Sequence, residues 1–342
     1  MYTRKRTYIM HAVCCLMVIV SAVMFGGCGH DDNGSPPPPT VDNSKISGTF
    51  TVTLVDATTP ATDYGTMTFD GAGNGLYTSL ASSNSNAFTY SVTVLDNELI
   101  IDSTIGTLNN AGNFFAGIDL NNGAETMIIG IKQASLFTDT TGTYRGGMFE
   151  LTNNFTPSAH VSEMLFTTHE TGTGGLLVTN LTSGSTGTLD YTIAPNGTFT
   201  IGPGPDILGA ISGDNNFFMF SSVGGGKDML SVALKYPSTG MTSARLNGTY
   251  RIYESWYYDS TGFGVTRSLV TFYGNGTGAR TVLQDSGGAS GTDAFTYTVA
   301  SDGSFVVNGT DMKGFVLEDG SALVLSDDNP NGDITSAIGI KD

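Results

Sequence analysis

The chain has 342 residues, of which 31 are acidic, 14 are basic and 46 are glycine, and its formal net charge is −17. Because phosphate recognition depends on clustered Lys and Arg, this charge argues against nucleic acid and anionic lipid headgroups as partners. Three cysteines and four histidines do not supply the closely spaced ligands of a zinc or haem site, so we expect neither cofactor.

Residues 1–27 are typical of a secretory signal. Residues 4–6 are basic, residues 8–25 form an apolar run, and two glycines precede Cys28. The basic end of such a signal stays in the cytoplasm while the apolar run enters the translocon. Removal of the segment takes away three basic residues and no acidic one, so the mature chain is more acidic still. Cys14 and Cys15 leave with it, which predicts a mature fold without disulfides.

The end of the signal, Phe-Gly-Gly-Cys at residues 25–28, resembles the lipobox of bacterial lipoproteins, although Phe25 stands where that motif usually has Leu. The resemblance implies that Cys28 is the lipid attachment site, with more than one acyl chain and therefore stable anchoring. Gly29 follows, where an Asp would resemble an inner-membrane retention signal, so the resemblance implies the outer membrane. The alternatives are an uncleaved membrane anchor and an ordinary cleavage that leaves a free thiol.

Residues 28–47 are predicted to be the lipidated N-terminus and a spacer. The segment is polar and contains four consecutive prolines at residues 36–39, so it cannot bury enough apolar surface to fold. The prolines favour an extended polyproline helix, which would hold the folded part away from the membrane.

From residue 48 onward, short alternating apolar strands are separated by Asp-Gly and Asn-Gly turns, which predicts an all-β, antiparallel fold. The same landmarks recur three times in the same order. Each copy starts with Gly-Thr-aromatic and ends with an apolar strand that finishes in Lys. These landmarks predict three tandem repeats of about a hundred residues, at residues 48–132, 142–235 and 248–341.

Each repeat offers about eight short strands, which leaves two architectures open. The favoured one is a six-bladed β-propeller with two four-stranded blades per repeat, because the two halves of the third repeat can be aligned strand by strand. The strand that begins at Gly48 would then complete the last blade and close the ring. The alternative is three small eight-stranded, lipocalin-like barrels, each closed on itself, and this suits the one-faced alternation of the Thr-rich strands better. Sandwiches and a solenoid are less favoured.

The turn Thr-Phe-Asp-Gly-Ala-Gly-Asn at residues 68–74 is similar to turns of lipoproteins with tandem β-repeats from Gram-negative bacteria. The resemblance extends over most of residues 48–341. It concerns turns and strands, so it implies no activity.

No catalytic residue is predicted. The chain lacks a G-x-S-x-G elbow, and the mature part has only three histidines that could act as a base beside a nucleophile. His30 lies in the spacer, and His169 lies in an acidic hairpin that we expect to be an exposed loop. His160 is the third of these histidines.

Residues 327–333 form a weak calcium candidate. Asp327, Asn329 and Asn331 place oxygen-bearing side chains at alternate positions before a glycine, as a calcium loop does. Ile338 stands where such a loop has its Glu, and Asn, Asp and Gly are equally typical of a hairpin turn. The turn is the favoured interpretation.

The densest aromatic cluster lies at residues 253–258 and includes Trp256 and Tyr257. Such rings could stack on a carbohydrate ligand. Aromatic packing between neighbouring strands explains the same cluster, and this is the favoured interpretation.

The sequence therefore favours an exported, lipid-anchored envelope protein with a non-catalytic binding or scaffolding domain, whose partner would be a polysaccharide or a protein. One alternative is an extracellular glycan-active enzyme with paired carboxylates from different repeats in a central cleft. The other is a carrier of an apolar small ligand, which requires separate barrels with hollow apolar interiors.

Overall fold

The structure, a computed structural model, describes residues 39–57, 61–121, 125–137, 142–152, 158–166, 172–202, 207–222, 227–237, 240–258, 262–327 and 334–342. Thr40–Asp342 form one unit, distinct from Met1–Pro39. The predicted signal and Cys28 lie outside the described residues. Within the described ranges, no helix has the length and apolar character needed to cross a bilayer.

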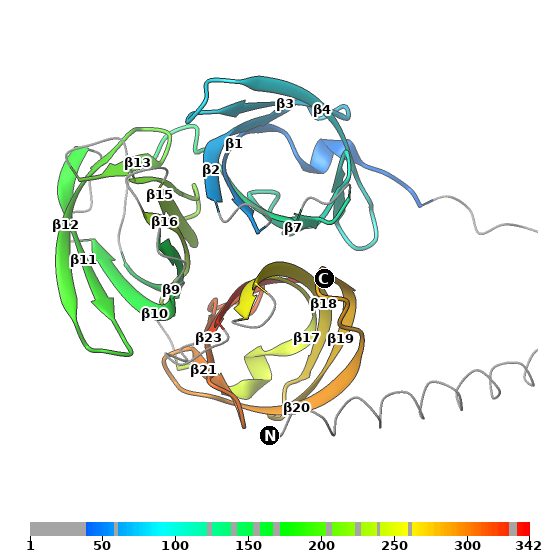
Figure 1. Cartoon of the computed structure of the whole chain (residues 1–342), viewed down its shortest axis with the longest axis vertical. Helices are drawn as coiled ribbons and strands as arrows, with labels where there is room; N and C mark the ends of the chain where they lie inside the picture. The colour runs from blue at the N-terminus through cyan, green and yellow to red at the C-terminus, as the bar shows by residue number, and fades with distance from the viewer. Residues whose placement is uncertain are drawn as a thin grey trace, which may run out of the picture. The chain divides into compact units, whose positions relative to one another are not determined.

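The described residues hold 24 antiparallel strands that close into three barrels of eight strands each (Figure 1). Barrel 1 consists of β1 (Gly48–Asp56), β2 (Ala61–Phe69), β3 (Asn74–Ser79), β4 (Ser85–Val92), β5 (Glu98–Ile101), β6 (Thr104–Leu108), β7 (Phe114–Asp119) and β8 (Thr126–Lys132). Barrel 2 consists of β9 (Thr143–Thr152), β10 (Ser158–Phe166), β11 (Gly172–Asn180), β12 (Thr186–Ile193), β13 (Thr198–Ile201), β14 (Ile207–Ile211), β15 (Phe217–Ser222) and β16 (Lys227–Lys235). Barrel 3 consists of β17 (Asn247–Tyr258), β18 (Gly262–Tyr273), β19 (Thr277–Asp285), β20 (Gly291–Val299), β21 (Ser304–Val307), β22 (Met312–Val316), β23 (Ala322–Asp327) and β24 (Ile334–Lys341).

The six-bladed propeller predicted from the repeats is wrong. The first strand of each barrel pairs with the last strand of the same barrel, in the pairs β1–β8, β9–β16 and β17–β24. The strand that begins at Gly48 therefore closes barrel 1 and does not complete a blade with the third repeat. Closure within each repeat satisfies the edge strands locally, so no ring of blades is needed to cover them.

One end of each barrel is filled by aromatic side chains. Three edge-to-face ring pairs recur at equivalent places, with centroids 5.0 to 5.1 Å apart: Phe69 with Tyr90, Phe166 with Tyr191, and Phe272 with Tyr297. The segment that precedes the first strand covers this end. In barrels 1 and 3 it contains the short 3-10 helices η1 (Asn43–Lys45) and η2 (Ser243–Arg245). The Tyr297 hydroxyl donates to the Leu246 carbonyl at 3.0 Å, which holds that cover in place.

The Thr-Phe-Asp-Gly-Ala-Gly-Asn segment forms the β2–β3 turn at the same end. The Asp70 carboxylate accepts hydrogen bonds from the backbone N–H groups of Ala72 and Asn74, at 2.7 and 3.0 Å. Gly71 and Gly73 have φ angles of +76° and +110°, which side chains with a Cβ rarely adopt. The motif is therefore explained by turn geometry alone.

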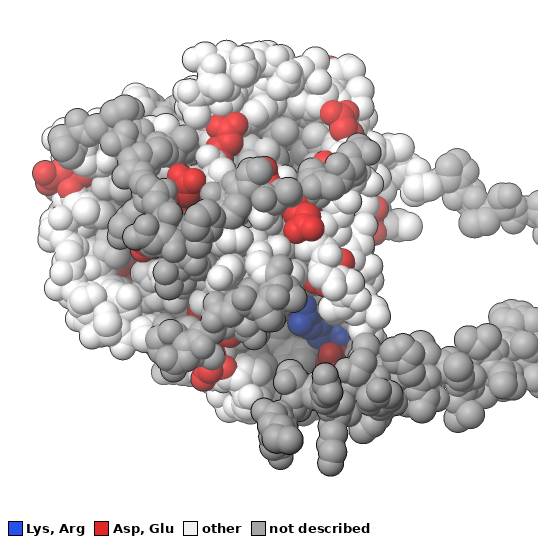
Figure 2. Space-filling model, in the orientation of Figure 1, with Lys and Arg blue, Asp and Glu red and all other residues white. Residues whose placement is uncertain are grey.

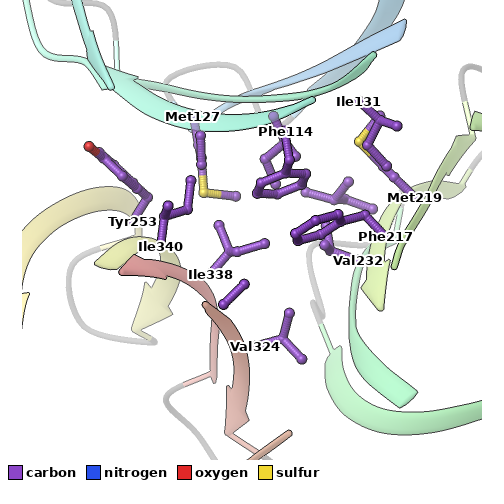
Figure 3. Packing of buried hydrophobic residues seen from close by; sticks show 14 of the residues in the cluster. Phe114, Met127, Ile131, Phe217, Met219, Val232, Tyr253, Val324, Ile338 and Ile340 are labelled. Carbon is purple, nitrogen blue, oxygen red and sulfur yellow. The ribbon is translucent and has the colours of Figure 1, made fainter. Parts of the chain in front are cut away.

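The three barrels pack against one another through a junction cluster of buried apolar side chains (Figure 3). It consists of Val55, Ala57, Phe114, Ala116, Ile118, Met127, Ile129 and Ile131 from barrel 1; Val161, Ala210, Phe217, Met219, Leu230, Val232 and Leu234 from barrel 2; and Tyr253, Val265, Phe315, Leu317, Ala322, Val324, Ile338 and Ile340 from barrel 3. The last hairpin of each barrel is thus buried on both faces: Phe114 points into the junction while Phe115 packs inside barrel 1.

Polar contacts also join the barrels. The hydroxyls of Thr107 and Tyr253 hydrogen-bond at 2.7 Å between barrels 1 and 3. The Tyr64 hydroxyl donates to the Gly209 carbonyl at 3.0 Å between barrels 1 and 2. Burial raises the pKa of Tyr253 to about 12, so this hydroxyl stays protonated at neutral pH.

Candidate functional site

Barrels 1 and 3 each contain a cavity, of about 240 and 220 Å³ respectively. In barrel 1 the lining reaches Asp102 and Ser103, and in barrel 3 it reaches Thr310. These residues belong to the β5–β6 and β21–β22 connections, at the end opposite the aromatic cover. Each cavity is therefore a cup that is closed at one end of its barrel.

The cavity of barrel 3 has apolar walls and a charged group. Val270, Phe272 and Phe295 are among its apolar lining residues, and Glu254, Arg280 and Asp293 are its charged ones. This composition is typical of small-molecule sites, in which apolar walls supply most of the contact area and a few polar groups orient the ligand.

Glu254 and Arg280 form an ion pair across the cavity wall. Arg280 Nη2 lies 2.6 Å from Glu254 Oε2, and Arg280 Nε donates to Ser268 Oγ at 3.0 Å. The Glu254 side chain is 9% exposed and that of Arg280 is 36% exposed. Burial raises the pKa of the Glu254 carboxyl, the Arg280 guanidinium opposes this rise, and the Asp285 carboxylate adds to it.

Glu254 occupies a position that is apolar in the other two barrels. It lies four residues after the aromatic residue that pairs with the last Lys of the repeat. In the other barrels, the residue four positions after the equivalent aromatic residue is Leu54 in barrel 1 and Met148 in barrel 2. Leu54 packs against the core of barrel 1, and Met148 is part of the core of barrel 2.

Arg280 and Asp293 also occupy positions that are uncharged in the other barrels. They face each other across the β19–β20 pairing. Arg280 lies two residues after Gly278, the residue of β19 that pairs with Phe272. The equivalent cross-strand pairs are Tyr77 with Asn86 in barrel 1 and Val178 with Gly187 in barrel 2. Three neighbouring positions are therefore charged in barrel 3 alone, a signal that comparison of the three repeats could have revealed from the sequence.

Trp256 lies beside this group. It follows Glu254 by two residues on β17, is 5% exposed, and donates through Nε1 to Thr266 Oγ1 at 2.8 Å. Thr266 lies opposite Glu254 in the β17–β18 pairing and donates its own hydroxyl to Asp285. The Tyr257 ring packs on Phe263 with centroids 4.7 Å apart. The sugar-stacking hypothesis for Trp256 and Tyr257 stays a prediction.

The calcium candidate falls largely outside the described residues. Asp327 ends β23, whereas Asn329 and Asn331 are not described. At the equivalent hairpin of barrel 1, Asp119 accepts hydrogen bonds from the Ser103 hydroxyl at 2.5 Å and the Asn121 N–H at 2.9 Å. In the part of the chain that the structure describes, no group of three or more His, Cys, Asp or Glu side chains could hold a metal ion. Calcium binding at residues 327–333 stays a prediction.

Acidic side chains from different barrels do meet Arg side chains. At the contact of barrels 1 and 3, Arg251 Nη2 lies 2.7 Å from Asp96, and Arg267 Nη2 lies 2.5 Å from Glu98. These carboxylates are therefore ion-paired. On the visible face in Figure 2 the acidic side chains of the described residues are scattered among uncharged residues.

A further groove of about 340 Å³ lies between barrels 1 and 2, and its lining contains five threonines together with Tyr64 and Phe199. Its described lining contains no charged side chain. Of these three cavities, only the cup of barrel 3 combines acidic and basic side chains in its described lining.

No family model matches the sequence, and no curated protein matches it either. Among solved structures, the chain is similar to the isotype 1 transferrin binding protein B from serogroup B Neisseria meningitidis, with 12% identity, a TM-score of 0.31, and coverage of 87% of this chain and 77% of that one. It is also similar to a protein of unknown function from Nostoc punctiforme, with 12% identity, a TM-score of 0.25, and coverage of 59% of this chain and 96% of that one. At these values neither similarity carries an argument about function.

Proposed function

We propose that this protein is an exported, lipid-anchored outer-membrane protein that binds a small, mainly apolar molecule without catalysis, in the cup of barrel 3. The observation that carries the proposal is the charged group of Glu254, Arg280 and Asp293 in the wall of an otherwise apolar cavity. Of the hypotheses from the sequence, this favours the ligand carrier, because that hypothesis requires separate barrels with apolar interiors.

The charged group is not explained by the needs of the fold. Removing a carboxylate and a guanidinium from water costs several kcal/mol per ion, which their attraction offsets only with good geometry. Barrels 1 and 2 have the same strand order and fill the Glu254 position with Leu54 and Met148. Since two of the three barrels fold with an apolar side chain at this position, we assign the charges in barrel 3 to the recognition of a ligand.

The anchor is proposed from the lipobox resemblance at residues 25–28. A Cys28→Ser variant should move from the membrane fraction to the soluble fraction of the envelope, whereas the unchanged chain stays with the membrane. Retention of the variant would instead mean that the apolar run at residues 8–25 anchors the protein uncleaved.

Binding is tested with the full chain in phosphatidylcholine vesicles, with 1-hexanol as a neutral probe. The fluorescence of Trp256, the one tryptophan in the sequence, reports on barrel 3. We expect a saturable fluorescence change and a rise in melting temperature with hexanol concentration, because a ligand that binds only the folded state stabilises it. A linear, non-saturating response equal to that of free tryptophan in the same vesicles would refute binding.

A further inference from the structure

We infer that the ligand of barrel 3 is an apolar molecule that carries one cationic amine; this inference rests on the proposed function. The cup has more negative than positive charge, and the negative charge that lacks a partner lies on its wall.

The Glu254 carboxylate has its counter-ion in Arg280, at 2.6 Å. Asp293 has none: it is exposed, lines the cavity, and its side chain forms no ion pair or hydrogen bond with any described residue. Asp285 adds a second carboxylate close enough to act on the ionisation of Glu254. The cup therefore offers the Asp293 carboxylate to a ligand cation, while a ligand carboxylate would face this like charge.

The charges lie at one end of the cup and the rings at the other. Tyr297 bonds the cover of the closed end, and Asp293 lies four residues away on the same strand, which is about 13 Å in an extended chain. Phe272 and Phe295 line the cavity between them, and Phe272 packs edge-on against Tyr297 at 5.0 Å. A bound molecule would thus place its apolar body on these rings and its polar head at Asp293. The faces of the same rings attract a cation and not an anion.

The size of the cup limits the ligand. A cavity of about 150 Å³ is known to hold benzene, so the 220 Å³ of this one fits a molecule of roughly eight or nine non-hydrogen atoms. A short alkylamine or an amine on a single ring meets this limit, whereas a long acyl chain would extend beyond the described cavity.

The experiment compares three probes with the same alkyl body, hexylamine, 1-hexanol and hexanoate, by titration of Trp256 fluorescence in the full chain in phosphatidylcholine vesicles. We expect the dissociation constant of hexylamine to be about tenfold lower than that of hexanol, from one charge-assisted hydrogen bond at Asp293, and that of hexanoate to be higher than both. Asp293→Asn should abolish the preference for the amine. Barrel 1 has Asn86 at the equivalent position, so the fold accepts this side chain.

Asp190→Asn is the matched control. Asp190 is an exposed residue of β12, the strand of barrel 2 equivalent to β20, and its removal changes the net charge by the same amount without touching the cup. It should leave the amine preference unchanged.

Each result has a distinct meaning. Tighter binding of hexanoate than of hexylamine, equal binding of the three probes, or an unchanged preference in Asp293→Asn would overturn the inference and leave the proposed function standing. Failure of all three probes to bind would overturn the proposed function itself. Loss of the preference in Asp190→Asn as well would mean that overall charge, and not the cup, selects the amine, which also overturns the inference.

Discussion

Replacement of Phe114 by Ala tests whether the three barrels form one structure through the junction cluster. The Phe114 side chain is fully buried, and its ring stacks on Phe217 of barrel 2 with centroids 4.3 Å apart and planes 9° apart (Figure 3). Truncation of a buried Phe to Ala costs about 3–5 kcal/mol, through lost apolar contact and the cavity that remains. We expect the free energy of unfolding to fall by this amount.

The ring pair itself is measured by a double-mutant cycle with Phe217→Ala, in urea unfolding followed by circular dichroism. A stacked pair contributes about 0.5–1.5 kcal/mol beyond its buried area, and this should appear as the coupling energy between the two substitutions.

Phe115→Ala is the matched control, because Phe115 is equally buried and adjacent but packs on Phe50 inside barrel 1, with centroids 5.5 Å apart. It should destabilise the protein by a similar amount and couple to Phe217→Ala by less than about 0.5 kcal/mol. A loss below about 1 kcal/mol for Phe114→Ala, or equal coupling for Phe114 and Phe115, would refute the packing of the barrels through this ring pair.

Three further predictions concern single residues. Arg280→Met should lower the free energy of unfolding by about 3 kcal/mol at pH 8, since it leaves the Glu254 carboxylate buried without its cation. The loss should be smaller at pH 5, because burial raises the pKa of Glu254 and the folded state gains a proton as the pH falls. Asp70→Asn should flatten the fall of melting temperature between pH 4 and 2: hydrogen bonds from Asn74 and Ala72 lower the pKa of Asp70 from 3.8 to about 2, so its contribution is present above pH 3.8 and lost towards pH 2. Gly264→Ala should shift the emission of the tryptophan and cost about 1–3 kcal/mol, because its Cβ would lie 2.1 Å from the indole Cζ2 atom.

Controls for these variants come from the same chain. Gly187→Ala adds a Cβ with no heavy atom within 4 Å, so it should change neither stability nor emission. An equal effect of the two glycine substitutions would contradict the packing of Trp256. A loss in Arg280→Met that grows as the pH falls would contradict the raised pKa of Glu254, and an unchanged acid profile in Asp70→Asn would contradict the lowered pKa of Asp70.

The all-β fold follows from the alternation of apolar and polar residues, but the closure of the strands does not. The propeller and the barrels require the same strands in the same order, and both pair the ends of a chain segment. The two architectures differ in which strand pairs with the first strand of each repeat. In the barrels this partner is the last strand of the same repeat, about 80 residues away in the sequence. Strands buried on both faces added to the ambiguity: Ile128 packs inside barrel 1 while Met127 and Ile129 lie in the junction, so the sequence shows only a continuous apolar run.

The candidate site shows the same limit at the scale of side chains. The aromatic cluster at residues 253–258 is evident in the sequence, yet the two faces of β17 go to different places. Tyr253 points into the junction cluster, whereas Glu254 lines the cup and Trp256 is buried beside it. The aromatic cluster seen in the sequence therefore combines residues from both faces of β17, one facing the junction cluster and the other facing the interior of barrel 3. The charges of Glu254 and Arg280 gain meaning only when they are compared with the equivalent positions of the other repeats.

The junction cluster and the charged group together explain how the interior of barrel 3 can differ from those of barrels 1 and 2. The outer face of the last hairpin of barrel 3 contributes Ala322, Val324, Ile338 and Ile340 to the junction, and without barrels 1 and 2 these side chains would form an exposed apolar patch. Barrel 3 also places Arg251 and Arg267 on carboxylates of barrel 1. Barrels 1 and 2 thus cover and orient barrel 3 from outside, which leaves the interior of barrel 3 free to diverge. A buried charged group that lowers the stability of one barrel is tolerated when the junction supplies stability that does not depend on that interior.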